Sequence, residues 1–155
     1  MAIDIRSIET FQAALDAQGL IPTDAIVILR NHDTGQTRER IDHAVGLMLS
    51  GYTPVLLMTY DSNTYTEAYR VFDIAMKADW KSITIVTHRC HHYRAYLTFA
   101  KVFDNAGGGL LCDIRSSPID DKPTVYEQLI EMQKIDDYIR KGHVATYEEG
   151  IKLLE

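Results

Sequence analysis

The sequence predicts an α/β protein with a three-layer Rossmann-like fold, in which helices cover both faces of a mostly parallel sheet of four or more strands. Short runs of consecutive apolar residues alternate along the chain with longer segments whose apolar residues recur at helical spacing. Runs that are apolar throughout are typical of parallel strands buried on both faces. No repeat, low-complexity segment or linker rich in Pro, Gly and Ser divides the 155 residues, so we expect a single domain over 1–155 that includes the helices of 122–155.

The first half of the chain contains a leading helix and two strand–helix pairs. Ile8, Phe11 and Leu15 share one helical face, and Gly19 ends that helix. Strands are predicted at 25–29 and 54–58, where the residues are AIVIL and PVLLM. The helices that follow these strands are marked by two apolar stripes: Ile41, Ala44, Val45, Met48 and Leu49, then Ala68, Val71, Phe72 and Ala75.

The second half repeats this order. Strands are predicted at 82–86 (SITIV) and 110–114 (LLCDI), and the glycines of 107–109 end the helix between them. That helix and the one after the fourth strand carry two apolar stripes: Tyr96, Phe99, Ala100 and Phe103, then Val125, Leu129, Met132 and Ile139. A last short helix opens at Thr146 with Glu149 as its capping-box partner. Strands and helices in strict alternation imply a parallel sheet with right-handed crossovers.

Composition restricts the class of protein. Sixteen Lys and Arg against 22 Asp and Glu give a net charge of −6, which argues against general binding to nucleic acids or anionic membranes. Cys90 and Cys112 are too few for a disulfide framework, so we expect reduced thiols and a cytoplasmic setting. The first dozen residues lack the apolar core of a signal peptide, and no stretch approaches the roughly 20 apolar residues of a membrane span.

An anion site is expected at one edge of the sheet. Ligands of open parallel sheets bind outside the carboxyl ends of the strands, where helix amino termini gather. The segments that follow the predicted strands are 30–33, 60–64, 87–92 and 115–117. Six of the nine arginines lie in these segments or in the helix starts just beyond them: Arg30, Arg38, Arg40, Arg89, Arg94 and Arg115. Because guanidinium groups match the geometry of phosphate and carboxylate, this distribution indicates a site for a small anionic molecule.

Particular side chains at this edge are candidates for binding and for proton transfer. The ligand-binding candidates are Asn31, Arg40, Asn63, Thr64, Arg89, Arg94 and Arg115. We expect Arg89 and Arg94 to clamp the anion. His91 is the candidate general acid or base, because imidazole titrates near neutrality, and Asp61 is the candidate activator of water.

Structural roles compete with these assignments. An arginine in these loops is also typical of a surface residue paired with an acid such as Glu39 or Asp113. Thr64 and Glu67 have the spacing of a capping box. The histidines at 88, 91 and 92, with Cys90 among them, suggest a metal site, but no H-E-x-x-H or C-x-x-C motif accompanies them, and no metal is predicted.

Three helix starts together resemble a known family. They are RIDHA at 40–44, NTYTEA at 63–68 and THRCHHYRA at 87–95. This set resembles the bacterial YdcF-like family, to which the SanA and ElyC proteins belong and whose pattern includes H-x-x-R-A after a strand ending in Thr or Ser. The resemblance covers about 25–114. It implies a Rossmann-like fold with Arg40, Thr64, His91 and Arg94 lining a shared pocket, and a family role in cell-envelope biogenesis.

The chain departs from the family pattern in two places. The family usually has a glycine-containing turn after its first strand, where this chain has Arg30, Asn31 and His32. The family also usually carries a further acidic segment between the second strand and the threonine turn, which this chain lacks. The departures suggest a different substrate.

Three functions fit these patterns. The first is an enzyme that hydrolyses or transfers the phosphoester of a small phosphorylated or nucleotide-type metabolite. The second is a non-catalytic module that binds a nucleotide or adenosylmethionine, since the sequence shows acid and base candidates but no activated nucleophile. The third is an interaction protein whose C-terminal helices pack on a partner, which exposed apolar residues there would favour. No cofactor is identified, and no G-x-S-x-G, Walker A or G-x-G-x-x-G motif is present.

Overall fold

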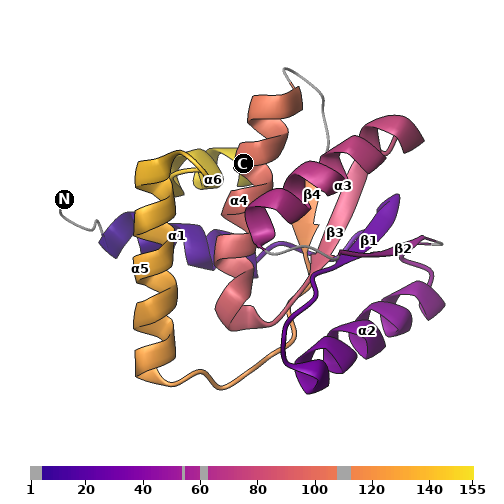
Figure 1. Cartoon of the computed structure of the whole chain (residues 1–155), viewed down its shortest axis with the longest axis horizontal. Coiled ribbons are helices and arrows are strands. Elements are labelled where there is room, and N and C mark those ends of the chain that lie inside the picture. The colour runs from indigo at the N-terminus through magenta and orange to yellow at the C-terminus, as the bar shows by residue number, and fades with distance from the viewer. Residues whose placement is uncertain (1–4, 54, 60–62, 108–112) are drawn as a thin grey trace.

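The protein is described by a computed structural model over residues 5–53, 55–59, 63–107 and 113–155 (Figure 1). Helices and strands alternate along the chain after a leading helix. They are α1 (Ile5–Asp16), β1 (Ala25–Ile28), α2 (Thr34–Leu49), β2 (Leu56–Met58), α3 (Thr64–Ala78), β3 (Ser82–Val86), α4 (Arg89–Gly107), β4 (Asp113–Ser116), α5 (Val125–Lys141) and α6 (Tyr147–Leu154).

The four described strands form one sheet in the order β2-β1-β3-β4, and every pair of neighbours is parallel. Ile28 pairs with Met58 on one side and with Val86 on the other, so β1 and β3 end at the same level at the centre of the sheet. The predicted three-layer α/β fold with a parallel sheet is therefore confirmed.

The two faces of the sheet are covered unequally. Ile26, Ile28 and Val86 pack against Ala44 of α2 on one face. On the other face Val27, Leu29, Ile83 and Ile85 join the larger core beneath α3 and α4, which continues to residues of α1, α5 and α6. Figure 1 shows α2 alone on its side of the sheet, with the other helices gathered on the opposite side. This uneven cover puts α5 beside α4, where it can reach the carboxyl edge of the sheet.

The helix starts differ in part from the predicted caps. Asn63 caps α3, because its side chain accepts a hydrogen bond from the N–H of Thr66 at 2.9 Å. The predicted capping box of Thr64 and Glu67 is therefore wrong, and both side chains are left for other roles. At α6, Thr146 is the N-cap as predicted, accepting from the N–H of Glu149 at 3.2 Å.

The fourth strand lies further along the chain than predicted. It covers Asp113–Ser116, and residues 110–112 of the predicted segment lie outside the described residues. Apolar runs identify strands that are buried on both faces, whereas β4 is an edge strand in which Asp113 is exposed. As a consequence Arg115 is part of the strand and does not follow it.

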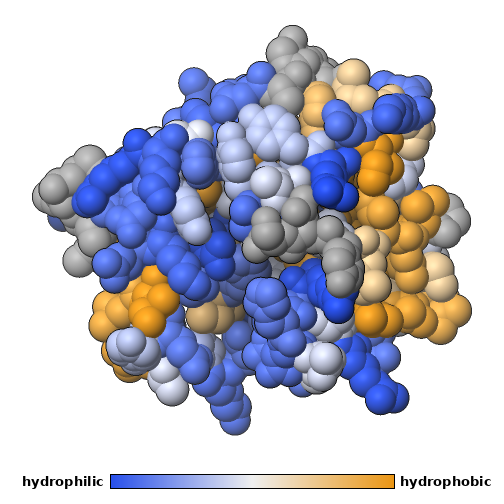
Figure 2. All heavy atoms as spheres, in the orientation of Figure 1, coloured by the Kyte–Doolittle hydropathy of each residue, from blue (hydrophilic) through white to orange (hydrophobic). Residues whose placement is uncertain are grey.

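Apolar side chains reach the surface in two regions. Figure 2 shows them over the start of α5 and over β2 with the neighbouring end of α2. Val125, Tyr126 and Leu129 at the start of α5 are exposed, as are Leu49 and Met58 in the second region. The exposed apolar residues of α5 are the feature that would favour the protein-interaction hypothesis, and the interaction itself stays a prediction. Among the described helices, none is both long and apolar enough to cross a bilayer.

Candidate functional site

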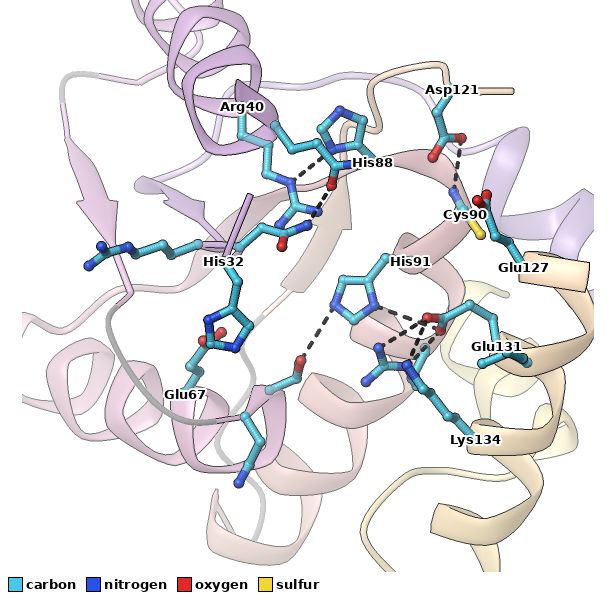
Figure 3. Close-up of a pocket in the computed structure, with 17 residues that line it drawn as sticks. His32, Arg40, Glu67, His88, Cys90, His91, Asp121, Glu127, Glu131 and Lys134 are labelled. Carbon is cyan, nitrogen blue, oxygen red and sulfur yellow. Dashed lines mark hydrogen bonds and ion pairs between the residues drawn. The ribbon is translucent and has the colours of Figure 1, made fainter. Parts of the chain in front are cut away.

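A cavity of about 740 Å³ opens at the carboxyl edge of the sheet. It lies between the ends of β1 and β3, the two central strands. The chain leaves β1 through α2 toward β2 at one edge of the sheet, and it leaves β3 through α4 toward β4 at the other edge, so the cavity occupies the switch point of the sheet. Figure 3 shows the side chains that surround it. They are Arg30, Asn31, His32, Gln36, Arg40, Asn63, Thr64, Glu67, His88, Cys90, His91, Arg94, Asp121, Glu127, Ile130, Glu131 and Lys134.

One wall of the cavity is a buried network centred on Arg40. The guanidinium donates from Nη1 to the carbonyl of Leu29 at 2.6 Å and from Nε to Nδ1 of His88 at 3.0 Å. Because Nδ1 of His88 accepts this bond, the ring proton lies on Nε2, which donates to Glu39 at 2.9 Å. Burial lowers the pKa of Arg40 to about 10, against the opposing effect of Glu67, and the side chain remains a cation at neutral pH.

The opposite wall is built around Glu131 of α5. Arg94 donates to its carboxylate from Nε at 2.7 Å and from Nη2 at 3.3 Å, so the pair has the two-point geometry typical of arginine and carboxylate. Burial favours the neutral acid, but the contacts with His91 and Arg94 outweigh it and hold the pKa of Glu131 well below its usual range. Glu131 is therefore an anion that offsets the charge of Arg94.

His91 lies between these walls. Its Nε2 is 3.4 Å from the hydroxyl of Thr64, and its Nδ1 is 3.9 Å from Oε2 of Glu131, a distance too long for a hydrogen bond. Burial, with the charge of Arg94 acting in the same direction, lowers the pKa of His91 to about 4. The ring is consequently neutral near pH 7 and is a proton acceptor there.

Charges of both signs line the cavity. Among the described lining residues, four are basic and four are acidic: Arg30, Arg40, Arg94 and Lys134, against Glu67, Asp121, Glu127 and Glu131. Figure 3 places Asp121, Glu127 and Glu131 on one side of His91, where Arg94 and Lys134 pair with Glu131, and Arg40 and His32 on the other side with Glu67, so acidic groups predominate on the first side and basic groups on the second. The cavity is thus bipolar, and not the uniformly cationic crevice that the arginines alone suggested.

The helix amino termini around the cavity are capped differently. Asp33 caps α2 by accepting from the N–H groups of Gly35 and Gln36, and Asp121 accepts from the N–H of Cys90 in the first turn of α4. Both caps are carboxylates. The cap of α3 is Asn63, which is neutral. The cap of α3 thus adds no negative charge of its own, although Glu67 in the first turn of this helix is acidic.

The structure brings most of the predicted ligand-binding residues together. Five of the seven predicted ligand-binding residues line the cavity, together with the candidate acid or base His91; the five are Asn31, Arg40, Asn63, Thr64 and Arg94. Asp61, the candidate water activator, lies outside the described residues. The convergence includes all four positions that the family resemblance places in one pocket.

Two predicted arginines lie elsewhere. Arg89 donates from Nη1 to Asp16 and from Nε to Asp120, each at 2.6 Å, on the side of α4 that faces α1. Arg115 donates to Asp113 at 3.0 Å and to a loop carbonyl before β1 at 3.1 Å. These are the acid pairings that compete with ligand binding, and neither arginine lines the cavity.

Several lining residues were not expected from the sequence. Glu127, Ile130, Glu131 and Lys134 come from α5, which follows the last strand and was not counted among the loops of the carboxyl edge. The sequence did carry a signal for them. Glu127 and Glu131 are four residues apart, as are Ile130 and Lys134, so each pair lies on one face of the helix. The two like charges of Glu127 and Glu131 repel each other on that face unless a cation lies opposite them. Glu67 was expected only as a capping partner.

The three histidines of the fourth helix start do not converge. His92 is buried on the side away from the cavity, where Nδ1 is 3.0 Å from the hydroxyl of Ser116 and Nε2 is 3.1 Å from Asp16. Over the described part of the chain, no group of three or more His, Cys, Asp or Glu is arranged to hold a metal ion. Burial, reinforced by Glu131 and Asp121, raises the pKa of the Cys90 thiol to about 11, so this thiol is protonated at neutral pH.

Fold and site together define a Rossmann-like α/β domain with a bipolar cavity at the switch point of its sheet. No protein-family model matches the sequence, and no curated protein matches it. Among solved structures the chain is similar to a transcription regulation repressor of the LacI family from Corynebacterium glutamicum, with 12% identity and a TM-score of 0.42. The alignment covers 96% of this chain and 53% of that one, so this chain spans about half its length. At this level of similarity the neighbour supports no functional argument.

Proposed function

We propose that the cavity binds a small phosphorylated or nucleotide-type ligand. The observation that carries this proposal is the meeting of Arg40 and Arg94, from separate helices, with the neutrally capped start of α3 in one cavity at the switch point. Cations and backbone N–H groups at such an edge are the partners that phosphate prefers. A volume of about 740 Å³ is in the range of small-molecule sites.

The acidic side of the cavity favours a ligand with hydrogen-bond donors at its other end. Asp121 and Glu127 line that side, and their carboxylate oxygens accept hydrogen bonds and carry no donor. Ribose hydroxyls and base amino groups supply such donors, and an acidic residue is a common partner of ribose in Rossmann-like sites. A nucleotide, with phosphate at one end and donors at the other, therefore matches both sides of the cavity.

The arrangement also supports the proposal that this chain is a YdcF-like domain protein. Arg40, Thr64, His91 and Arg94 come from the three helix starts on which the resemblance rests, and all four line one cavity. The glycine-containing turn of the family is replaced here by Arg30, Asn31 and His32, which line the same cavity. A ligand that differs from those of other members follows from that replacement.

A thermal-shift panel tests the proposal. The probes are inorganic phosphate, AMP, ADP and adenosylmethionine, applied to the wild type, Arg94→Ala and the control Arg38→Ala, whose side chain is exposed on α2 outside the cavity. A ligand at 100 times its Kd stabilises the folded state by about 2.7 kcal/mol. We expect AMP or ADP to raise the Tm of wild type and of Arg38→Ala equally, and to raise that of Arg94→Ala by less than half as much.

Two results would contradict the proposal. One is that no phosphate-bearing probe raises the Tm of the wild type. The other is a shift from adenosylmethionine alone, because that ligand carries a sulfonium cation and no phosphate. The second result would establish the non-catalytic adenosylmethionine module in place of the phosphate site.

A further inference from the structure

A hydroxyl, an imidazole and a carboxylate stand in a row across the cavity. Thr64 Oγ1 lies 3.4 Å from Nε2 of His91, and Nδ1 of the same ring lies 3.9 Å from Oε2 of Glu131. The three side chains come from α3, α4 and α5, and each lines the cavity. Figure 3 shows His91 reaching toward Glu131 from the centre of the site. This is the order of groups that activates a hydroxyl nucleophile, at the longer distances common before a substrate binds.

The hydroxyl of Thr64 is placed for attack on a bound anion. Because Asn63 caps α3, the Thr64 side chain is not used in capping and turns to His91 instead. Thr64 is the first residue of α3, so a negatively charged group bound to its oxygen would lie at the positive end of the helix dipole. Arg94 lines the same cavity; its Nε and Nη2 are hydrogen-bonded to Glu131, so Nη1 is the group that can donate to charge that develops on the transferred group.

A second set of the same residue types shows why access matters. His92 joins the hydroxyl of Ser116 and the carboxylate of Asp16 at 3.0 and 3.1 Å, which is tighter than the set in the cavity. Ser116 is nevertheless buried in β4 and does not line the cavity, so no substrate reaches its oxygen. Of the two sets, only the one with Thr64 meets the ligand.

We propose that Thr64 is the nucleophile of a phosphoryl transfer, that His91 is its general base, and that Glu131 positions His91. The proposal rests on the phosphate site proposed above. Thr64 Oγ1 attacks the phosphorus of a phosphate monoester, the Oγ1–P bond forms and the ester P–O bond breaks. The Thr64 proton passes to Nε2 of His91 and then to the leaving oxygen, which departs as an alcohol.

Water completes the reaction. It attacks the phosphorus of phosphothreonine 64 and gives one proton to His91, the Oγ1–P bond breaks, and His91 returns that proton to Oγ1. The products are inorganic phosphate and the original hydroxyl. No oxidant or reductant takes part, and the net reaction is hydrolysis of the monoester.

The test uses p-nitrophenyl phosphate with the full chain. Samples are quenched in acid within the first turnovers, their intact mass is measured, and the phosphorylated residue is identified by peptide sequencing in the mass spectrometer. We expect the wild type to carry one phosphoryl group on Thr64 and to release p-nitrophenolate. Thr64→Ser should keep the label and release product within about tenfold of the wild-type rate, because serine supplies the same hydroxyl. Thr64→Val should carry no label and release product at least 100-fold more slowly.

Controls separate chemistry from folding and from binding. Thr10→Val, on the exposed surface of α1, should behave as the wild type. Glu131→Gln should lower kcat and also lower KM, since it weakens the positioning of His91 while it removes a carboxylate that repels the phosphate dianion. A merely structural role for Glu131 would lower the Tm without this split. The Tm of each variant without ligand shows whether it folds.

Each remaining outcome decides one of the two proposals. Stabilisation of the wild type by phosphate or a nucleotide, with no phosphoryl group on Thr64, would overturn the nucleophile and leave the binding site intact. A label on another residue, or wild-type turnover by folded Thr64→Val, would overturn it as well. Absence of both binding and labelling would remove the phosphate site on which the inference rests.

Discussion

Replacement of Arg40 by methionine tests whether the buried network is the foundation of the site. Methionine keeps most of the length of the side chain and removes the guanidinium. The change deletes the donors to the carbonyl of Leu29 and to Nδ1 of His88, two acceptors that are almost completely buried. It also removes the attraction between Arg40 and the carboxylate of Glu67, which is itself buried.

The expected cost follows from these contacts. A hydrogen bond that involves a charged group contributes about 1.5–3 kcal/mol, and a buried acceptor left without its donor retains the cost of its desolvation. Two such bonds, together with the lost attraction between Arg40 and the buried Glu67, place the loss of stability for Arg40→Met at about 3–5 kcal/mol. For a chain of this size that corresponds to a fall in Tm of roughly 10 °C.

Urea unfolding followed by circular dichroism measures the loss directly. Arg38→Met is the matched control, because Arg38 is on the same helix and exposed, and its effect should stay within about 0.5 kcal/mol of zero. Arg40→Lys should recover part of the loss, since an ammonium group supplies a donor but not the fixed fork of guanidinium. A loss below about 1 kcal/mol for Arg40→Met would refute the argument that this arginine holds the cavity wall together.

Two further predictions concern acidity and packing. Burial lowers the pKa values of His91 and His92 to about 4. Between pH 6.5 and pH 4 the unfolded chain therefore binds more protons than the folded one. Acidification from pH 7.5 to pH 5 should lower the free energy of unfolding, measured in urea, by about 2 kcal/mol for each histidine. In α6, a methyl group on Gly150 would lie 2.8 Å from Phe11, so Gly150→Ala should lower the free energy of unfolding by about 1–2 kcal/mol. Gly46 on α2 faces open space, so Gly46→Ala should raise that free energy by about 0.5–1 kcal/mol, because alanine favours the helix.

Each of these has its own contrary result. The acid effect should shrink by about half in His92→Asn or His91→Asn, and an unchanged pH dependence in both variants would assign the effect to other groups. For the glycines, equal stabilisation by both substitutions would contradict the packing argument. It would show that the ring of Phe11 can move away from a methyl group on Gly150 with little loss of stability. The two helical glycines serve as controls for each other because helix propensity changes equally in both.

The fold was predictable because its central elements are apolar on every face. β1 is buried throughout and β3 is buried from Ile83 to Val86, and the predicted strands at 25–29 and 82–86 coincide with them to within one residue. At the edges of the sheet this signal weakens: only the last two residues of the predicted run at 110–114 belong to β4, which is described from Asp113 and contains Arg115. Edge strands contact fewer neighbours, so their sequences are less constrained and their bounds are less certain from sequence alone.

The site was predicted most directly where its residues follow the strands. Asn31 follows β1, and His91 lies in the first turn of the helix after β3, so the rule for parallel sheets places both at one edge. Glu131 lines the cavity as Asn31 and His91 do, but it reaches this edge of the sheet because α5 packs on α4. That packing depends on the whole tertiary structure. Arg94 was assigned to the ligand from its residue type, its place at a helix start and the family resemblance, whereas the structure shows that its first partner is this glutamate.

The neighbouring histidines of α4 show how a helix separates two roles that the sequence presents together. His91 and His92 are adjacent, and a helix directs adjacent side chains about 100° apart, so one faces the cavity and the other faces the core beside α1. Both rings are neutral at pH 7 because both are buried, and both contact a hydroxyl and a carboxylate. Residue type and protonation state therefore do not distinguish them. Access to the cavity does: it is the reason that we propose the ring beside Thr64 for chemistry, whereas the ring beside Ser116 joins β4 to Asp16 of α1.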